Sequence, residues 1–263
     1  MSRFDLSGRC ALVTGGARGL GAGMAEALTA AGARVVIADV LKDVGEQTAA
    51  GLAGCGFVEL DVTSDTAWEG AMAHTIAELG GLDVLVNNAG IEITQLIVDT
   101  EPDDVRRMLD VNILGTMLGI KHGLRAMRPG GAAGRGGAII NIASVAATIA
   151  FPAIAGYSAT KSAVDRLTRV AAMESGKLGY GVRVNCLYPG LVATDMGVKL
   201  AVETAGLGLF ESPDAAVAAV IELTPSGRLG EVSDMADAVV FLASDASRFV
   251  NGVGLAVDGG MGM

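Results

Sequence analysis

Aromatic side chains are scarce in this sequence, making up 4% of its 263 residues, with one tryptophan and three tyrosines. Stacked rings therefore cannot dominate the core, which must consist of small aliphatic side chains. Hydrophobic residues reach 51% and charged residues only 18%, a composition that excludes a disordered chain. Glycine is abundant instead, at 38 residues, about twice its ordinary frequency. We expect many tight turns and close backbone approaches.

Basic residues are also in deficit, with 19 lysines and arginines against 29 acidic residues, for a formal net charge of −10. A negative surface repels phosphate backbones and anionic lipids, so neither nucleic acid nor a membrane is an expected partner. Cys10, Cys55 and Cys186 are odd in number and lack metal-ligand spacing, which predicts free thiols and no metal site. The first twelve residues lack the apolar core of a signal peptide. We therefore expect a cytoplasmic protein.

Short β-branched runs alternate with longer segments of helical period, which indicates βαβ units and a parallel sheet. The uncharged stretch 136–160 contains glycine, asparagine and proline, so it predicts a buried strand and a loop, not a membrane span. We predict a single doubly wound α/β domain over residues 1–263, because no linker divides the chain. Its seven predicted strands are Cys10–Thr14, Arg34–Asp39, Phe57–Asp61, Val84–Asn88, Ala138–Ala143, Arg183–Leu187 and Gly254–Val257.

The segment Gly190–Gly230 departs from this alternation and is predicted to form a helical lid over a substrate site. Within it, Ser212, Pro213 and Asp214 are typical of a helix start. Its basic residues are Lys199 and Arg228, so a bulky, uncharged substrate is favoured. In the alternative interpretation, part of the segment packs a subunit interface. The apolar residues concerned are Met196, Leu200, Leu207, Leu209 and Phe210, of which the last three are the interface candidates.

The first predicted strand ends in a glycine-rich turn, Thr14–Gly21, that leads into a helix-like segment. Such a turn lets the backbone approach a pyrophosphate, whose charge the helix N-terminus stabilises. The next strand ends in Asp39, where a carboxylate can accept hydrogen bonds from an adenosine ribose and would repel a 2′-phosphate. A dinucleotide site follows, with NAD favoured over NADP. Arg18 argues the other way, because its guanidinium could pair with that phosphate.

Tyr157 and Lys161 are four residues apart, so a helix places both on one face. A neighbouring ammonium favours the phenolate and is expected to lower the tyrosine pKa from about 10, which would permit acid–base chemistry. The alternative is an unremarkable pair on an exposed helix.

Taken together, these motifs resemble the short-chain dehydrogenase/reductase family, over essentially the whole chain, in its compact single-domain form. The matching segments are the glycine turn Thr14–Gly21, Asn87–Gly90, Asn112, Ser144 with Tyr157 and Lys161, and Pro189–Gly190 with Thr194. The resemblance implies a Rossmann fold and a nicotinamide cofactor. It also implies that Tyr157 exchanges a proton with the substrate oxygen and that Lys161 lowers its pKa and binds the nicotinamide ribose.

The remaining roles are likewise implied by the resemblance. Ser144 would hold the substrate carbonyl or alkoxide, and Asn112 would position a water that relays protons through Lys161. Asn88 and Asn112 could instead be structural amides, and Ser144 could merely cap the following turn. Besides Asp39, Tyr157 and Lys161, the residues expected at the cofactor are Gly15, Arg18, Gly19, Leu20, Gly21, Asp61, Val62, Asn88, Ala89, Gly90, Pro189, Gly190, Val192 and Thr194.

The expected activity is NAD-dependent interconversion of a secondary alcohol and a ketone, with a steroid-like or other bulky apolar substrate. The alternatives are a 3-oxoacyl-thioester reductase using NADPH, to which the ending Asp258–Met263 is similar, a polyol dehydrogenase and a non-catalytic dinucleotide-binding regulator. Relatives form dimers or tetramers through helices equivalent to Asp103–Met127 and Tyr157–Lys177, so a homotetramer is expected. Apolar or small residues predicted to be spare for it are Leu114, Met117, Leu118, Ala163, Val164, Leu167 and Ala171.

Overall fold

A parallel sheet runs through the middle of the molecule, with strand order β3-β2-β1-β4-β5-β6-β7 across residues 3–263, the part of the chain that the computed structural model describes. The strands are β1 (Cys10–Thr14), β2 (Arg34–Asp39), β3 (Gly56–Glu59), β4 (Val84–Asn87), β5 (Gly137–Ile142), β6 (Val182–Pro189) and β7 (Gly254–Val257). The order reverses between β1 and β4, and the carboxyl ends of strands at such a switch point form a crevice where ligands bind.

Strand residues alternate between two cores, because successive side chains point to opposite faces of a sheet. In β1, Leu12 belongs to the core under one face, whereas Ala11 and Val13 belong to the other. In β4, Leu85 and Val86 divide in the same way. Aliphatic side chains thus fill both layers, as the scarcity of aromatics requires.

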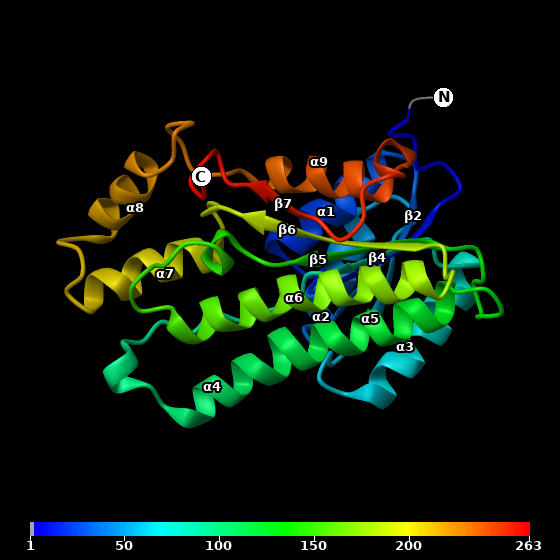
Figure 1. Ribbon diagram of the computed structural model, residues 1–263, viewed down its shortest axis with the longest axis horizontal. Coiled ribbons are helices and arrows are strands. Elements are labelled where there is room, and N and C mark those ends of the chain that lie inside the picture. Colours follow the sequence, from blue (N-terminus) through cyan, green and yellow to red (C-terminus); the bar gives the residue numbers. More distant parts are fainter. Residues whose placement is uncertain (1–2) are drawn as a thin grey trace.

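Helices cover both faces of the sheet (Figure 1). On one face α1 packs against α9, and on the other α3, α5 and α6 lie side by side. Local signals define their ends: the Ser64 hydroxyl accepts a hydrogen bond from Ala67 N at the start of α3, and Gly80, at φ 76°, ends it. The helices are α1 (Gly19–Ala30), α2 (Lys42–Gly51), α3 (Asp65–Leu79), α4 (Pro102–Met108), α5 (Gly115–Met127), α6 (Ala155–Lys177), α7 (Asp195–Gly206), α8 (Pro213–Glu222) and α9 (Val232–Ala243).

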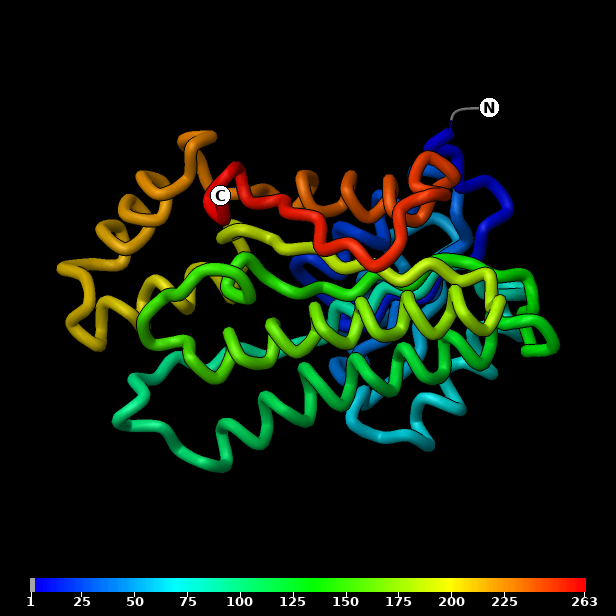
Figure 2. The backbone as a smooth tube through the Cα atoms, viewed as in Figure 1, coloured from blue at the N-terminus to red at the C-terminus, as the bar shows by residue number. Residues whose placement is uncertain are grey.

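The segment 190–230 forms α7 and α8, which pack against each other at one end of the molecule, away from the helices that cover the sheet (Figure 1). The predicted start of α8 is confirmed, because the Ser212 hydroxyl accepts from Ala215 N. Figure 2 shows the C-terminus returning beside this segment, while the N-terminus lies toward the opposite end. The role of α7 and α8 as a substrate lid stays a prediction.

Strands β3 to β6 differ by one or two residues at their ends from the predicted ranges, and two differences affect predicted site residues. β3 ends at Glu59, so Asp61 lies in a turn where its carboxylate accepts from Thr63 N and Oγ1. The predicted helix Asp103–Met127 is interrupted by a π-helical segment, Leu109–Leu114, that carries Asn112. π-helical turns often occur at functional sites.

The prediction of spare apolar residues on α5 and α6 was partly wrong. Leu118, Val164 and Ala171 are buried in the protomer's own core, because the helices use these positions to cover the sheet. Leu114 and Met117 are exposed, as predicted. Across residues 3–263, no helix combines the length and the apolar character needed to cross a bilayer.

Candidate functional site

The glycine-rich turn adopts backbone conformations that only glycine accepts readily. Gly15 and Gly19 have φ values of 63° and 58°. A Cβ atom on Gly21 would collide with the carbonyl oxygen of Gly15, so helix α1 could not start this close to β1 with a larger residue. A Cβ on Gly19 would meet nothing within 4 Å, so its backbone faces open space at the helix start. That open space is where an anionic group can approach the helix N-terminus.

A network from β4 holds this turn in place. The Asn88 Nδ2 donates to the carbonyl oxygens of Thr14 and Gly15, at 3.0 and 3.1 Å. The Thr14 hydroxyl in turn accepts from the backbone N–H groups of Asn88 and Ala89, both at 3.1 Å. The structural interpretation of Asn88 is confirmed by these contacts. Asn88 and Ala89 therefore tie the chain after β4 to the glycine turn.

Asp39 ends β2 next to the turn. Its Oδ2 accepts from Ala17 N at 3.1 Å, and its Oδ1 accepts from Leu41 N at 3.0 Å. The side chain is only half-buried, so both oxygens retain lone pairs for a ligand's hydroxyl groups. Arg18 extends from the turn into solvent, and its guanidinium lies 3.7 Å from the Asp195 carboxylate of α7. Arg18 therefore makes an exposed ion pair with the predicted lid.

Tyr157 and Lys161 lie on α6, one helical turn apart as predicted. Lys161 is 4% exposed as a residue, and its ammonium donates to the Ile142 carbonyl oxygen at 2.8 Å and lies 5.5 Å from the centre of the Tyr157 ring. Ser144, which follows β5, faces the same space, and its hydroxyl accepts from Ala146 N at 3.1 Å. Ser144 thus caps the short turn after it and also lines the site.

The expected lowering of the Tyr157 pKa was wrong for the free chain. Burial raises the pKa of Tyr157 to about 12, the negative charge of Glu92 acts in the same direction, and a hydrogen bond with Ser144 opposes them. Burial also lowers the pKa of the Lys161 ammonium to about 8. Desolvation thus disfavours the charged form of both groups.

Asn112 is fully buried where the π-helical segment meets α6. Its Oδ1 accepts from Ile91 N, and its Nδ2 donates to the Ile91 carbonyl oxygen and to the Thr160 hydroxyl, at 2.9 to 3.0 Å. A Cβ on Gly90 would come within 3.3 Å of both Asn112 Oδ1 and Lys161 Nζ. The Asn112 amide therefore fastens the chain after Gly90 to α6. The water that the resemblance implies at Asn112 stays a prediction.

Some of the other predicted residues line a cavity, and others lie outside it. Pro189 ends β6 and Gly190 follows it, Val192 pairs with Gly230 at the base of the α7–α8 segment, and the Thr194 hydroxyl caps α7. One cavity is lined by Leu20, Pro189, Gly190, Val192 and Thr194. Asp61 and Val62 do not line it, and lie in the turn after β3, where the Val62 carbonyl oxygen accepts from Trp68 Nε1.

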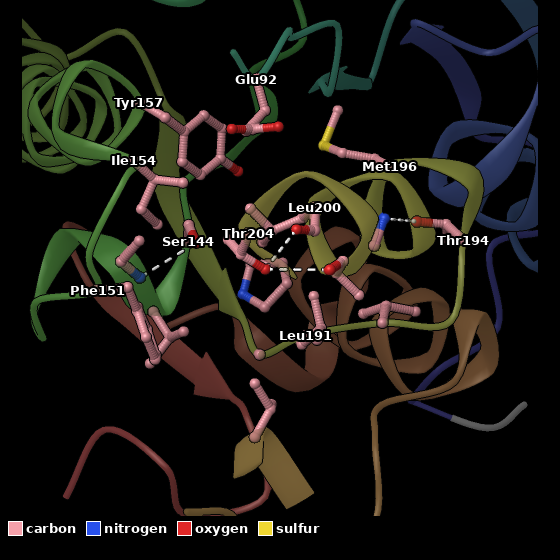
Figure 3. Close-up of a pocket in the computed structure, with 18 of the residues that line it drawn as sticks. Glu92, Ser144, Phe151, Ile154, Tyr157, Leu191, Thr194, Met196, Leu200 and Thr204 are labelled. Atoms are coloured by element: carbon pink, nitrogen blue, oxygen red, sulfur yellow. Dashed lines mark hydrogen bonds between the residues drawn. The ribbon is translucent and has the colours of Figure 1, made fainter. Parts of the chain in front are cut away.

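This cavity, of about 170 Å³, opens between the strand ends and α7 and α8 (Figure 3). Ser144 and Tyr157 lie at one side of it, and aliphatic and aromatic side chains form most of the rest. Of the apolar residues predicted in the lid, Met196, Leu200 and Phe210 line it, whereas Leu207 and Leu209 do not. Lining residues that the sequence analysis missed include Phe151, Ile154, Leu191, Val220 and Met261.

Glu92 was also missed, although one signal was available. It is an acidic residue between Ile91 and Ile93, directly after the Asn87–Gly90 motif. The structure buries it at 6% exposure in the wall of the cavity, and burial raises its pKa. No group of three or more histidine, cysteine or acidic side chains with the geometry of a metal site occurs between residues 3 and 263.

Comparison with known proteins shows the family. A family model described as "Enoyl-(Acyl carrier protein) reductase" matches residues 15–262. The chain is 39% identical over 272 residues to trans-4-hydroxycyclohexanecarboxylate dehydrogenase of Sinomonas cyclohexanicum, covering 99% of this chain and 96% of that protein. It is 41% identical over 256 residues to 3-alpha-(or 20-beta)-hydroxysteroid dehydrogenase of Mycobacterium bovis, covering 97% and 90%.

A solved structure agrees with these relatives. The crystal structure of 3-ketoacyl-(acyl-carrier-protein) reductase from Brucella melitensis, complexed with NADH, superposes with a TM-score of 0.88 at 31% identity and covers 98% of this chain and 100% of that one. The chain therefore belongs to the short-chain dehydrogenase/reductase family, whose members bind a nicotinamide dinucleotide and act on hydroxyl groups or the corresponding ketones.

Proposed function

We propose that this protein is an NAD-dependent dehydrogenase that interconverts a bulky, largely apolar secondary alcohol and its ketone. The observation that carries the proposal is the convergence of Tyr157 and Ser144 on one side of an apolar cavity that opens at the strand ends beside the glycine turn. Aliphatic walls favour a ring or steroid-like skeleton, because burial of apolar surface provides the binding free energy. The two relatives named above act on a hydroxycyclohexanecarboxylate and on hydroxysteroids, as their names state.

The crevice beside the cavity fits a dinucleotide. The positive-φ glycines bring backbone close to the start of α1 and leave space in front of Gly19, as a pyrophosphate requires. The Asp39 carboxylate can accept from both hydroxyls of an adenosine ribose and would repel a 2′-phosphate. Arg18 is paired with Asp195, which reduces its pull toward such a phosphate. NAD is therefore the proposed cofactor, bound with the residues named above at the turn, after β4 and at Pro189–Thr194.

In this proposal the nicotinamide, when bound, accepts or donates the hydride. Tyr157 takes the proton from the substrate hydroxyl during oxidation and returns it during reduction, and the Ser144 hydroxyl holds the same oxygen. Lys161 places its ammonium beneath the phenol and has its position fixed by the Ile142 carbonyl. Asn112 acts as a positioning residue, because its amide holds the backbone after Gly90 against α6.

One observation favours a second candidate, reduction of 3-oxoacyl thioesters with NADPH. The structure from Brucella melitensis is that of a 3-ketoacyl-(acyl-carrier-protein) reductase, complexed with NADH, and it covers 98% of this chain. Against this candidate stand the Asp39 carboxylate and the net charge of −10, which would repel an acidic carrier protein.

We further propose that the protein is a cytoplasmic homotetramer. Free thiols suit a reducing compartment, and Cys10 and Cys186 are buried in the core as small apolar side chains. Exposed apolar side chains on neighbouring helices α5 and α6, such as Met117, Val170 and Met173, support self-association through that face.

The proposed activity is tested by following reduced-cofactor absorbance with NAD or NADP and a panel of alicyclic alcohols, hydroxysteroids, polyols and 3-hydroxyacyl thioesters. We expect turnover of bulky apolar alcohols with NAD, and a loss of roughly a hundredfold or more in kcat for Tyr157→Phe. Turnover of 3-hydroxyacyl thioesters with NADP alone would instead establish the second candidate. Cofactor binding without turnover of any compound would favour a non-catalytic regulator.

A further inference from the structure

Glu92 is a polar group of the cavity that the proposed proton transfer does not use. Its Oε1 accepts from the Thr94 hydroxyl at 2.9 Å, whereas its Oε2 is buried without a hydrogen-bond partner. A buried carboxylate oxygen without a partner is unfavourable, and such groups in folded proteins call for a specific explanation. Because Glu92 lines the cavity, a ligand can supply the missing donor.

The nearby cation does not satisfy this oxygen. Lys199 Nζ donates to the backbone carbonyl of Glu92 at 3.2 Å and lies 3.5 Å from Glu203 Oε1. The Glu203 Oε2 is itself buried without a partner. Lys199 is thus the cation nearest to two acidic side chains, Glu92 and Glu203, but pairs only with Glu203. The excess negative charge disfavours an anionic substrate group near Glu92.

Glu92 lies close enough to the reacting position to contact the same substrate. Figure 3 shows its carboxylate beside the Tyr157 ring, and its charge contributes to the raised pKa of that phenol. A substrate whose reacting oxygen lies between Tyr157 and Ser144 thus places neighbouring atoms of its skeleton near Glu92. Apolar residues such as Met196, Leu200 and Phe151 form the remaining walls, so a second polar group on the substrate is best received at Glu92.

We propose that Glu92 determines substrate specificity by accepting a hydrogen bond from a second hydroxyl group, so that the preferred substrate is an alicyclic diol. This inference rests on the proposed function, because it assumes that the substrate's reacting oxygen lies at Tyr157. It selects against two related compounds: a monoalcohol, which leaves Oε2 unpaired, and a hydroxy acid, whose carboxylate faces Glu92.

The test compares three compounds built on one ring, cyclohexanol, cyclohexane-1,4-diol and 4-hydroxycyclohexanecarboxylate. For the wild-type enzyme we expect kcat/KM with NAD to be roughly 10- to 100-fold higher for the diol than for cyclohexanol, as for a hydrogen bond to a charged group. Glu92→Leu should abolish that preference. Glu92→Gln keeps a hydrogen-bond acceptor without the charge, so it should retain part of the preference for the diol. It should also raise kcat/KM for the hydroxy acid relative to kcat/KM for the diol.

Glu203→Gln is the matched control, since it removes a neighbouring, partly exposed carboxylate charge outside the cavity lining, and it should leave the diol-to-cyclohexanol ratio of kcat/KM unchanged. If Glu92→Leu does not fold, Glu92→Gln still tests the inference. A rise in kcat/KM for the hydroxy acid relative to the diol would support it, and an unchanged ratio would overturn it. Equal kcat/KM for diol and cyclohexanol in the wild-type enzyme, unaltered in both Glu92 variants, would overturn the inference while leaving the proposed function intact.

Binding without turnover separates the two proposals. Dissociation constants of the diol and of cyclohexanol are measured by calorimetry on NAD-saturated Tyr157→Phe enzyme, with and without Glu92→Leu. A diol preference that Glu92→Leu removes supports the inference even if the wild-type enzyme oxidises none of the compounds, a result that would count against the proposed function alone. No preference in this assay argues against the role of Glu92.

Discussion

Lys161 is expected to lower the stability of the protein at neutral pH, and a variant without its charge should reveal this. Lys161 is 4% exposed as a residue, and its ammonium donates to the Ile142 carbonyl oxygen and pairs with no carboxylate among residues 3–263. Burial lowers the pKa of Lys161 from 10.5 to about 8. The folded state therefore binds this proton less tightly than the unfolded state does.

The sign and size of the effect follow from proton linkage. Because the folded-state pKa is lowered, the penalty is fully present below pH 8 and disappears as the pH rises from 8 to 10.5. At about 1.4 kcal/mol per pKa unit, the wild-type free energy of unfolding should gain about 2.5 kcal/mol between pH 7 and pH 10 relative to a Lys161→Met variant. Loss of the hydrogen bond to Ile142 changes the free energy of unfolding of the variant equally at both pH values. It therefore cancels from this difference.

Urea denaturation of both proteins at pH 7 and pH 10, at one fixed protein concentration, measures the difference. Lys177→Met, which removes an exposed lysine near the end of the same helix, is the control and should show a much smaller pH-dependent difference. If the free energy of unfolding changes by the same amount between pH 7 and pH 10 in wild type and in Lys161→Met, the reasoning is refuted. Such a result would mean that the ammonium is hydrated in the folded protein.

Three further predictions concern the cofactor crevice and assembly. Asp39→Asn removes the charge and keeps one of the two acceptors for Ala17 N and Leu41 N, so the ratio of kcat/KM with NADP to that with NAD should rise roughly tenfold. An unchanged ratio would show that Asp39 does not select the cofactor. Asn88→Ala loses the two hydrogen bonds that hold the Thr14 and Gly15 carbonyls, so the free energy of unfolding measured in urea should fall by about 1 to 3 kcal/mol. A free energy of unfolding equal to that of wild type would contradict this role. Light scattering during size-exclusion chromatography should show the wild-type protein as a tetramer at micromolar concentration. Met173→Glu, which places a charge on an exposed apolar position, should give smaller species. A monomeric wild-type protein would disprove the proposed assembly.

Much of the fold was predictable because local signals and the overall architecture agree. Short aliphatic runs such as the one at Ala11–Val13 form buried strands whose residues face two cores, and the start of α8 follows from three adjacent residues. The glycine turn was predictable for a similar reason, since positive φ at Gly15 and Gly19 is a backbone requirement that the sequence displays directly. The helical spacing of Tyr157 and Lys161 also followed from sequence alone.

Tertiary structure alone decided the environment of these residues. The sequence pairs a phenol with an ammonium, but only the packing shows that both are desolvated, which raises one pKa and lowers the other. Leu118 and Val164 are apolar residues on surface helices, and only the sheet beneath them shows that they belong to the core. Glu92 is one acidic residue in an apolar segment, and its meaning depends on where Lys199 and Glu203 lie, more than 100 positions away. Composition and spacing thus determine which elements form, whereas burial and charge at the site depend on contacts between residues far apart in the chain.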